Sequence, residues 1–142
     1  MRSLAAILLA AGALLAAGCG EPKSFLYSEA GALYDAGRYE ESFPLMRKAA
    51  DGGNTQAMAL LGVMLLYGQG VAPDGRAAEH WLVRAAERGE VEAQSIAGIM
   101  YATGVGVPPD SEKARHWLTI AAGNGDAAAR RLLAQTPSAV SY

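Results

Sequence analysis

Residues 54–89 and 90–125 carry one pattern written twice: the first copy reads NTQAMALLGVMLLYGQGVAPDGRAAEHWLVRAAERG and the second EVEAQSIAGIMYATGVGVPPDSEKARHWLTIAAGNG. Leu61-Gly62, His80-Trp81 and Gly89 of the first copy return 36 residues later as Ala97-Gly98, His116-Trp117 and Gly125. A fixed period of about 20–50 residues is typical of arrays in which each copy is one supersecondary unit. The constant spacing therefore predicts a solenoid of stacked, similar units.

Each copy contains two stretches with apolar residues at helical spacing, so the repeated unit is a helical hairpin. A shortened first pair precedes the two full copies, because it lacks five residues in its inter-helix loop. Helices are expected over about 25–36, 39–50, 55–67, 75–88, 91–102, 111–122 and 126–134. The predicted repeat domain spans 25–134, with units 25–53, 54–89 and 90–125, a capping helix over 126–134 and a flexible tail over 135–142. This is an all-α, right-handed solenoid of helical hairpins.

The N-terminal stretch is expected to direct export. Residues 1–18 read MRSLAAILLAAGALLAAG, in which Arg2 is followed by an uncharged apolar run that ends in small residues. This order is typical of a secretory signal peptide, and the run is shorter than the roughly 20 apolar residues of a membrane-spanning helix. The alternative, a buried N-terminal helix, is disfavoured by Gly12 and Gly18, which weaken helices.

Cys19 is the only cysteine in the chain and so has no partner for an internal disulfide. The stretch from Leu15 to Cys19 resembles the lipobox of bacterial lipoproteins. This resemblance implies cleavage before Cys19, acylation of Cys19, a tether over 19–24 and an outer-membrane location facing the periplasm. The family prefers Leu where this chain has Ala16, and the small residues before Cys19 also suit the ordinary signal peptidase. A soluble periplasmic protein is therefore the alternative.

The charge balance disfavours nucleic acid as a partner. After the first 18 residues are removed, 11 basic and 14 acidic residues remain. A mildly acidic surface repels phosphate backbones, and the sequence contains no run of Lys or Arg. We therefore expect no nucleic-acid binding, and membrane contact only through the acyl group on Cys19.

The spaced matches resemble the Sel-one-like repeat, a branch of the tetratricopeptide superfamily. The pattern of that family is Ala, Leu-Gly, an aromatic, Gly-x-Gly-Val, Asp, Lys-Ala, Trp, Ala-Ala and a closing Gly. The second full copy carries it as Ala93, Ala97-Gly98, Tyr101, Gly104-Val-Gly106-Val107, Asp110, Lys113-Ala114, Trp117, Ala121-Ala122 and Gly125. The first full copy departs from it at Leu65, which replaces the aromatic residue.

Most of these positions have a packing role. Gly62 and Gly98 lie inside helices, where glycine costs about 1 kcal/mol relative to alanine, so we expect close approach of a second helix there. Gly70 and Gly106 permit backbone angles closed to other residues. The remaining two structural positions, Trp81 and Trp117, are expected to fill the space between the two helices of each unit.

The sequence does not support an enzyme, a cofactor site or a metal site. Gly68-x-Gly70 follows a helix and lacks the Lys and the third Gly of a phosphate-binding loop. His80 and His116 belong to different units and have no accompanying cysteine or carboxylate cluster, so we expect them to point outward. No Ser/His/Asp or Cys/His arrangement is visible.

A partner-binding groove is the remaining candidate site. The stretch from Gln56 to Tyr67 is apolar nearly all round, and the resemblance implies that peptides bind in the concave groove of such a stack. The expected groove residues are Ala59, Val63, Leu66, Tyr67, Ser95, Ile99 and Thr103; alternatively, they are ordinary core between helices.

The predicted function is a non-enzymatic, lipid-anchored interaction scaffold of the bacterial cell envelope, which binds a protein or peptide through this groove. Two alternatives stay open. One is a secreted hydrolase acting on cell-wall material, because relatives of such repeats have been linked to that chemistry. The other is a structural subunit of an envelope assembly.

Overall fold

The computed structural model describes residues 23–135, and every regular element in that range is an α-helix. The helices are α2 (Lys23–Asp35), α3 (Tyr39–Asp51), α4 (Thr55–Tyr67), α5 (Gly75–Glu87), α6 (Val91–Thr103), α7 (Ser111–Gly123) and α8 (Ala127–Gln135). They form three hairpins and a closing helix, which confirms the all-α solenoid.

The boundaries of the repeat domain differ slightly from the prediction. Helix α2 begins at Lys23, so the last two residues assigned to the tether belong to the helix. Helix α8 ends at Gln135, the first residue assigned to the tail. The signal peptide, Cys19 and the rest of the tail lie outside the described residues. Between Lys23 and Gln135, no helix is long and apolar enough to cross a membrane.

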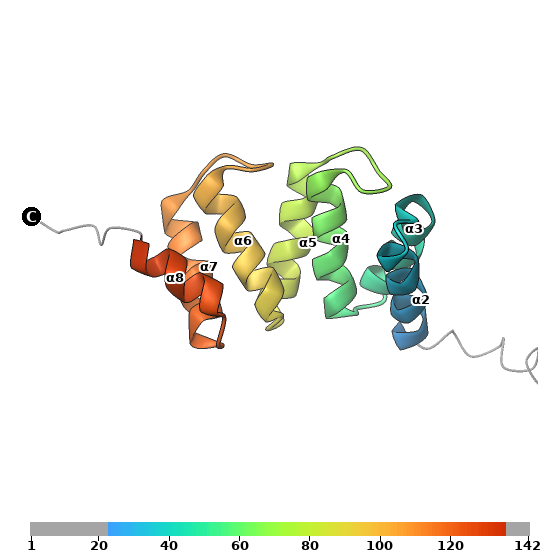
Figure 1. Cartoon of the computed structure of the whole chain (residues 1–142), viewed down its shortest axis with the longest axis horizontal. Helices are drawn as coiled ribbons and strands as arrows, with labels where there is room; N and C mark the ends of the chain where they lie inside the picture. Colours follow the sequence, from blue (N-terminus) through green and yellow to red (C-terminus); the bar gives the residue numbers. More distant parts are fainter. Residues whose placement is uncertain (1–22, 136–142) are drawn as a thin grey trace, which may run out of the picture.

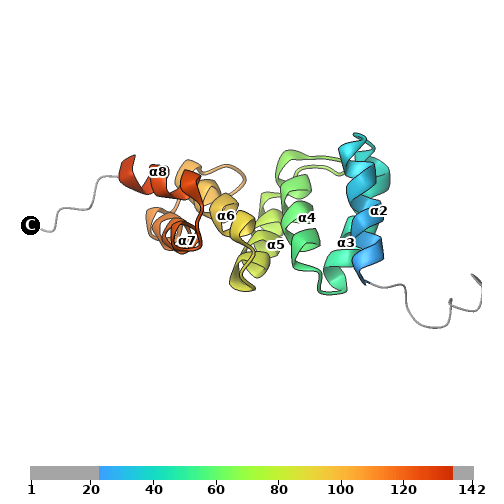
Figure 2. The same cartoon turned by 60° about the horizontal axis from the view of Figure 1, so that its bottom comes forward.

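The hairpins stand in a row, and each helix packs mainly on the next one in the chain. Figures 1 and 2 show the row running from α2 at one end to α8 at the other. The first helices of the pairs, α2, α4 and α6, lie on one side of the row, and the second helices, α3, α5 and α7, lie on the other. We call the side formed by α2, α4 and α6 the first-helix face.

Side-chain caps and glycines set the helix ends. The carboxylate of Asp74 accepts the backbone N–H of Ala77 at the start of α5, and Asp110 accepts that of Lys113 at the start of α7. These bonds satisfy N–H groups that have no partner inside the helix. Gly68 and Gly104 end α4 and α6 in the left-handed conformation, which is the common glycine cap.

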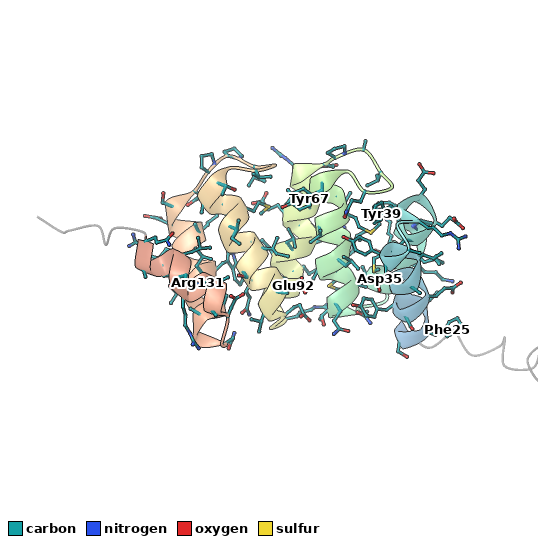
Figure 3. The ribbon with its side chains drawn as sticks, in the orientation of Figure 1. Phe25, Asp35, Tyr39, Tyr67, Glu92 and Arg131 are labelled. Carbon is teal, nitrogen blue, oxygen red and sulfur yellow. The ribbon has the colours of Figure 1, made fainter. Side chains whose placement is uncertain are left out.

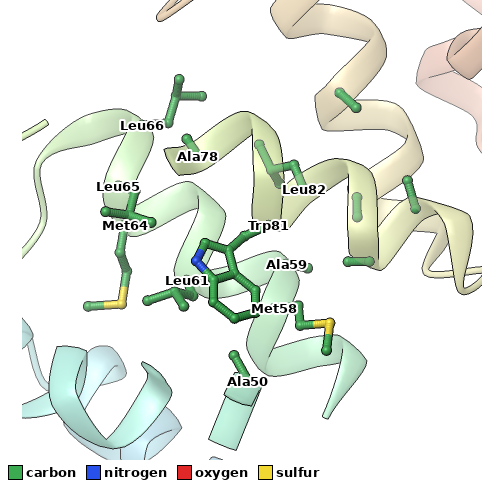
Figure 4. Close-up of a cluster of buried hydrophobic side chains, with 14 of the residues drawn as sticks. Ala50, Met58, Ala59, Leu61, Met64, Leu65, Leu66, Ala78, Trp81 and Leu82 are labelled. Carbon is green, nitrogen blue, oxygen red and sulfur yellow. The ribbon is translucent and has the colours of Figure 1, made fainter. Parts of the chain in front are cut away.

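The core of each full hairpin surrounds its tryptophan. Trp81 of α5 is 9% exposed, and Figure 4 shows its indole among Ala50, Met58 and Leu61. Trp117 occupies the matching place in the next hairpin and is also buried. Each of these side chains joins the two helices of its own pair to the common core, which extends over all three pairs.

Gly62 and Gly98 bring the two helices of a hairpin close together. A methyl group on Gly62 would lie 2.6 Å from Cγ of the fully buried Leu82, and one on Gly98 would lie 2.6 Å from Cγ of Leu118. These distances are well inside van der Waals contact. The helical glycines therefore make room for a leucine of the partner helix.

The glycine loops join successive hairpins. A methyl group on Gly70 would overlap the backbone of Tyr39 and Glu40 at the start of α3, and one on Gly75 would overlap the backbone carbonyl of Gly106. The loop after α4 thus rests on the start of α3, and the loop after α6 rests on the start of α5. Gly70 and Gly106 also have positive φ angles, of 74° and 77°.

We predict that Gly75→Ala lowers the free energy of unfolding by about 1–3 kcal/mol, the cost of overpacking a tight contact. The loop backbone of Gly106 must move to admit the methyl group. The matched control is Gly31→Ala inside α2, where nothing lies within 4 Å of the added carbon. That change should raise stability by about 0.5–1 kcal/mol, the helix preference for alanine. Thermal melting of both variants checks this, and equal effects would contradict the loop contact.

Candidate partner-binding surface

The first-helix face contains a small cavity of about 110 Å³. Its lining comes from three helices and the residue before α6: Tyr27 of α2; Gln56, Ala59, Leu60 and Val63 of α4; and Glu90, Glu92 and Ile96 at the start of α6. No residue of α3, α5 or α7 takes part. The cavity therefore spans three successive pairs, and neither one hairpin nor two could form it.

The floor of the cavity is apolar because α4 contains no charged residue at all. Leu60 and Val63 lie one helical turn apart on the outer side of α4, and Ile96 of α6 is the equivalent of Leu60 one repeat later. All three are half-buried against the main core. They offer apolar surface to an incoming side chain without leaving the core.

The rim of the cavity is acidic. Glu90 and Glu92, at the start of α6, line the cavity together with Tyr27 of α2. Burial raises the pKa of Tyr27, and the carboxylates of Glu90, Glu92 and Asp35 raise it further. The phenol is therefore a neutral hydrogen-bond donor, and negative potential surrounds it. Figure 3 labels Glu92, Asp35 and Tyr67 among the side chains of α6, α2 and α4.

A strip of apolar side chains continues from the cavity toward the C-terminal ends of α4 and α6. Tyr67, one turn beyond Val63, is 65% exposed, and Ile99 is 38% exposed. Thr103 is also exposed, but its hydroxyl donates to the carbonyl of Ile99 at 2.8 Å. Four of the residues expected in a groove, Val63, Tyr67, Ile99 and Thr103, therefore reach the surface of the first-helix face.

Three other expected groove residues are buried, and for two of them, Leu66 and Ser95, the prediction that they face a partner is wrong. Leu66 is 8% exposed and lies beneath the glycine loop, since a methyl group on Gly106 would meet its Cδ1 at 2.6 Å. Ala59 lines the cavity but is only 5% exposed. Ser95 is 6% exposed and hydrogen-bonds Asp126, the residue before α8. Leu66 and Ser95 therefore contact other parts of the stack, whereas Ala59 stays at the base of the cavity.

Sequence reasoning missed Tyr27, Leu60 and Ile96. Counting the outer side of α4 in steps of four, three and four gives Gln56, Leu60, Val63 and Tyr67, and adding 36 gives the matching residues of α6. That register was available in the sequence. The position of Tyr27 was not, because it depends on how the shortened first pair docks against α4.

The opposite side of the row has two open depressions at equivalent places. One of about 590 Å³ is lined by His80, Val83 and Tyr101 among other residues, and one of about 600 Å³ is lined by His116, Thr119 and Ile120 among others. In the first, the Tyr101 hydroxyl donates to Glu79 at 2.6 Å, so that carboxylate is already occupied. Both histidines are exposed beside their buried tryptophans.

The described residues contain no metal-binding cluster. Within residues 23–135, no three His, Cys, Asp or Glu side chains gather where they could hold a metal ion. The chemistry that the first-helix face can offer is recognition of another molecule by apolar contact and negative charge.

The repeated architecture agrees with a known family. The profile of the Sel1 repeat matches residues 27–54, 55–90 and 91–126, which is most of the chain. The chain belongs to the Sel1 repeat family. The match over residues 27–54 shows that the shortened first pair is also a repeat of this family. Sel1 repeat proteins are generally protein-interaction scaffolds and are generally not enzymes.

Solved structures support the same architecture. A Sel1 repeat protein from Oxalobacter formigenes is 38% identical with a TM-score of 0.64, and the match covers 68% of this chain and 28% of that one. A protective antigen of uropathogenic Escherichia coli strains with an SLR fold is 32% identical with a TM-score of 0.73, covering 78% and 25%. This Sel1 repeat chain thus spans about a quarter of the length of those proteins.

A more distant structure shows the fold alone. Cysteine-rich protein B of Helicobacter pylori is 22% identical with a TM-score of 0.60, and the match covers 65% of this chain and 69% of that one. No curated protein matches the chain.

The contact between Ser95 and Asp126 gives a prediction that separates packing from binding. The Asp126 carboxylate accepts the backbone N–H groups of Ala128 at 2.7 Å and Ala129 at 3.0 Å. The Ser95 hydroxyl is the main cause that lowers the pKa of Asp126, and the two N–H groups add to it. In Ser95→Ala, the pKa of Asp126 should rise toward its ordinary value, and the protein should lose about 1 kcal/mol of stability at neutral pH.

The sign of the pH dependence follows from the lowered pKa. The stabilisation is present above the unfolded pKa of about 4 and is lost as the pH falls through the folded value. The stability difference between Ser95→Ala and the native protein should therefore shrink in acid. An NMR titration of the Asp126 carboxyl measures the shift directly; an unchanged titration would show that Ser95 does not hold this carboxylate.

Proposed function

We propose that this Sel1 repeat protein is an interaction scaffold of the bacterial cell envelope, anchored by lipid at Cys19, that binds a partner through the first-helix face. The observation that carries the proposal is the apolar cavity and strip shared by α2, α4 and α6. Exposed apolar side chains that lie together mark interaction sites more often than scattered ones do. The general role of Sel1 repeat proteins as interaction scaffolds also supports the proposal that this face binds a partner.

The first-helix face is favoured over the opposite side because it combines an enclosed cavity with exposed anchors. Tyr67 is 65% exposed at the last position of α4, and Ile99 is 38% exposed one turn before the end of α6. Exposed aromatic side chains such as Tyr67 carry much of the energy in protein interfaces. The depressions beside His80 and His116 are wide and rimmed by charges of both signs.

We predict that Tyr67→Ala weakens partner capture by about 1–2 kcal/mol, the scale of an interface anchor. It should change the melting temperature little, because the ring is mostly exposed. Trp81→Ala, by contrast, should cost about 3–5 kcal/mol of stability, because it empties the core of its hairpin. Pulldown from solubilised envelopes and thermal melting, run on both variants, separate the two effects.

Phe25→Ala is the matched control for Tyr67→Ala. Phe25 is an aromatic residue of similar exposure, 55%, but it lies on α2, outside both the cavity lining and the strip on α4 and α6 that contains Tyr67. Its loss should leave capture unchanged. If Tyr67→Ala melts as early as Trp81→Ala and the partner is still captured in proportion to folded protein, Tyr67 belongs to the core and the binding surface lies elsewhere.

The anchor is tested separately. Cys19→Ser removes the thiol that the lipobox-like stretch would present for acylation. Two or three acyl chains hold a protein firmly on a membrane, whereas one does so only marginally. We expect the variant to move from the membrane fraction to the soluble periplasmic fraction and the native protein to incorporate labelled palmitate. A variant that stays with membranes, together with an unlabelled native protein, would refute the anchor.

A further inference from the structure

We propose that the first-helix face selects a basic linear segment, in which one aliphatic side chain enters the cavity and flanking Lys or Arg residues face Glu90 and Glu92. This inference rests on the proposed function, because it names the chemistry of the partner that the same surface binds. It follows from three features: the size of the cavity, its acidic rim and the distribution of charge between the two sides of the row.

The cavity matches a single aliphatic side chain. Its volume is about 110 Å³, and an apolar protein cavity of roughly 150 Å³ is large enough to bind benzene. Leu60, Val63 and Ile96 supply the apolar lining. A linear segment can insert one such side chain and still place its neighbouring residues along the rim of the cavity.

Charge is segregated between the two sides of the row. Helices α2, α4 and α6, with Glu90 just before α6, contain four acidic residues and, apart from Lys23 at the start of α2, no basic one. The acidic residues are Glu29, Asp35, Glu90 and Glu92. Helices α3, α5 and α7 contain six acidic and six basic residues. A ligand that approaches the first-helix face therefore meets negative potential, whereas the other side is balanced.

The acidic rim is not neutralised from within the protein. Glu90 precedes α6 but makes no side-chain capping bond there, and Glu92 is exposed in the first turn of that helix. The basic residue nearest to them in the chain, Arg88, points to another partner: its guanidinium donates to the backbone carbonyl of Gly53 at 3.4 Å. Complementary charge on the ligand would supply the missing cations and would steer its approach.

The test begins with a random linear peptide library selected on the immobilised full chain. Two end-blocked peptides are then measured, each with one leucine flanked on both sides by lysines or by glutamates. We expect enrichment of peptides with an aliphatic residue among Lys or Arg, and binding of the lysine-flanked peptide alone. Its binding should weaken as ionic strength rises, because exposed charges are screened by salt. Replacing its leucine by serine should abolish binding.

The decisive variant is Glu90→Gln with Glu92→Gln, which keeps shape and removes both charges. It should bind the lysine-flanked peptide about 3- to 30-fold more weakly, the range for one or two exposed ion pairs. The matched control is Glu112→Gln, at the second position of α7 just as Glu92 is at the second position of α6. This control variant should bind as the native protein does.

The other outcomes overturn the inference in distinguishable ways. If peptides are enriched and depend on Tyr67 and Ile96 but show no preference for basic residues, the proposed function stands and the charge selection falls. If no peptide is enriched, or the enriched peptides ignore every change on the first-helix face, the inference of a linear segment falls; the proposed function falls with it only if capture in the pulldown is also independent of Tyr67. If the protein self-associates and Glu92→Gln abolishes this, a second copy occupies the surface, with the basic residues of α8 as its charged end.

Discussion

Close docking of one hairpin on the next, through alanine, is the contact on which the rest of the structure depends. Ala57, Ala93 and Ala129 follow one another at intervals of 36 residues, and each is fully buried where a first helix meets the preceding pair. Ala50, Ala86 and their neighbours face them from the preceding second helix. The distance between packed helices depends on the side chains at the contact. Small residues there bring the hairpins near enough for the loops to rest on the preceding helix starts.

Polar bonds across the same junctions repeat with the same period. The amide of the buried Gln94 donates to the carbonyl of Ala86 at 3.1 Å and accepts from the side chain of Asn124 at 2.9 Å. One period later, Arg130 donates to the carbonyl of Ala122. Both carbonyls lie at helix ends, where they also accept the backbone N–H of Gly89 and Gly125 from the following loops. The first-helix face is what this packing leaves uncovered: α4 has more apolar residues than its two neighbours can bury, and the surplus lines the cavity and the strip.

The repeat, its period, the helices and the packing roles of the recurring residues all follow from the order of residues along the chain. Period and helical spacing are local properties of the chain, so they can be counted without knowing any contact. The predicted helices agree with the observed ones to within about two residues at each end. The burial of the tryptophans also follows from the sequence, because a large apolar side chain that recurs at one position of a helical hairpin has nowhere else to pack.

Which apolar residues of α4 and α6 remain exposed depends on how the hairpins and their loops pack against one another. The sequence pattern predicted that Leu66 and Ser95 would contact a partner. In the structure, the loop at Gly106 covers Leu66, and Ser95 hydrogen-bonds Asp126, the residue that caps α8. Ser111 stands 36 residues after Gly75, so the repeat pattern does not predict a special role for Gly75. Its contact with Gly106 depends on the packing of the loop after α6 on the start of α5. The cavity needs Tyr27, Leu60 and Glu92, which are 33 and 32 residues apart along the chain. Contacts between side chains this distant depend on the angle and spacing at which hairpins dock, and a local pattern does not contain that information.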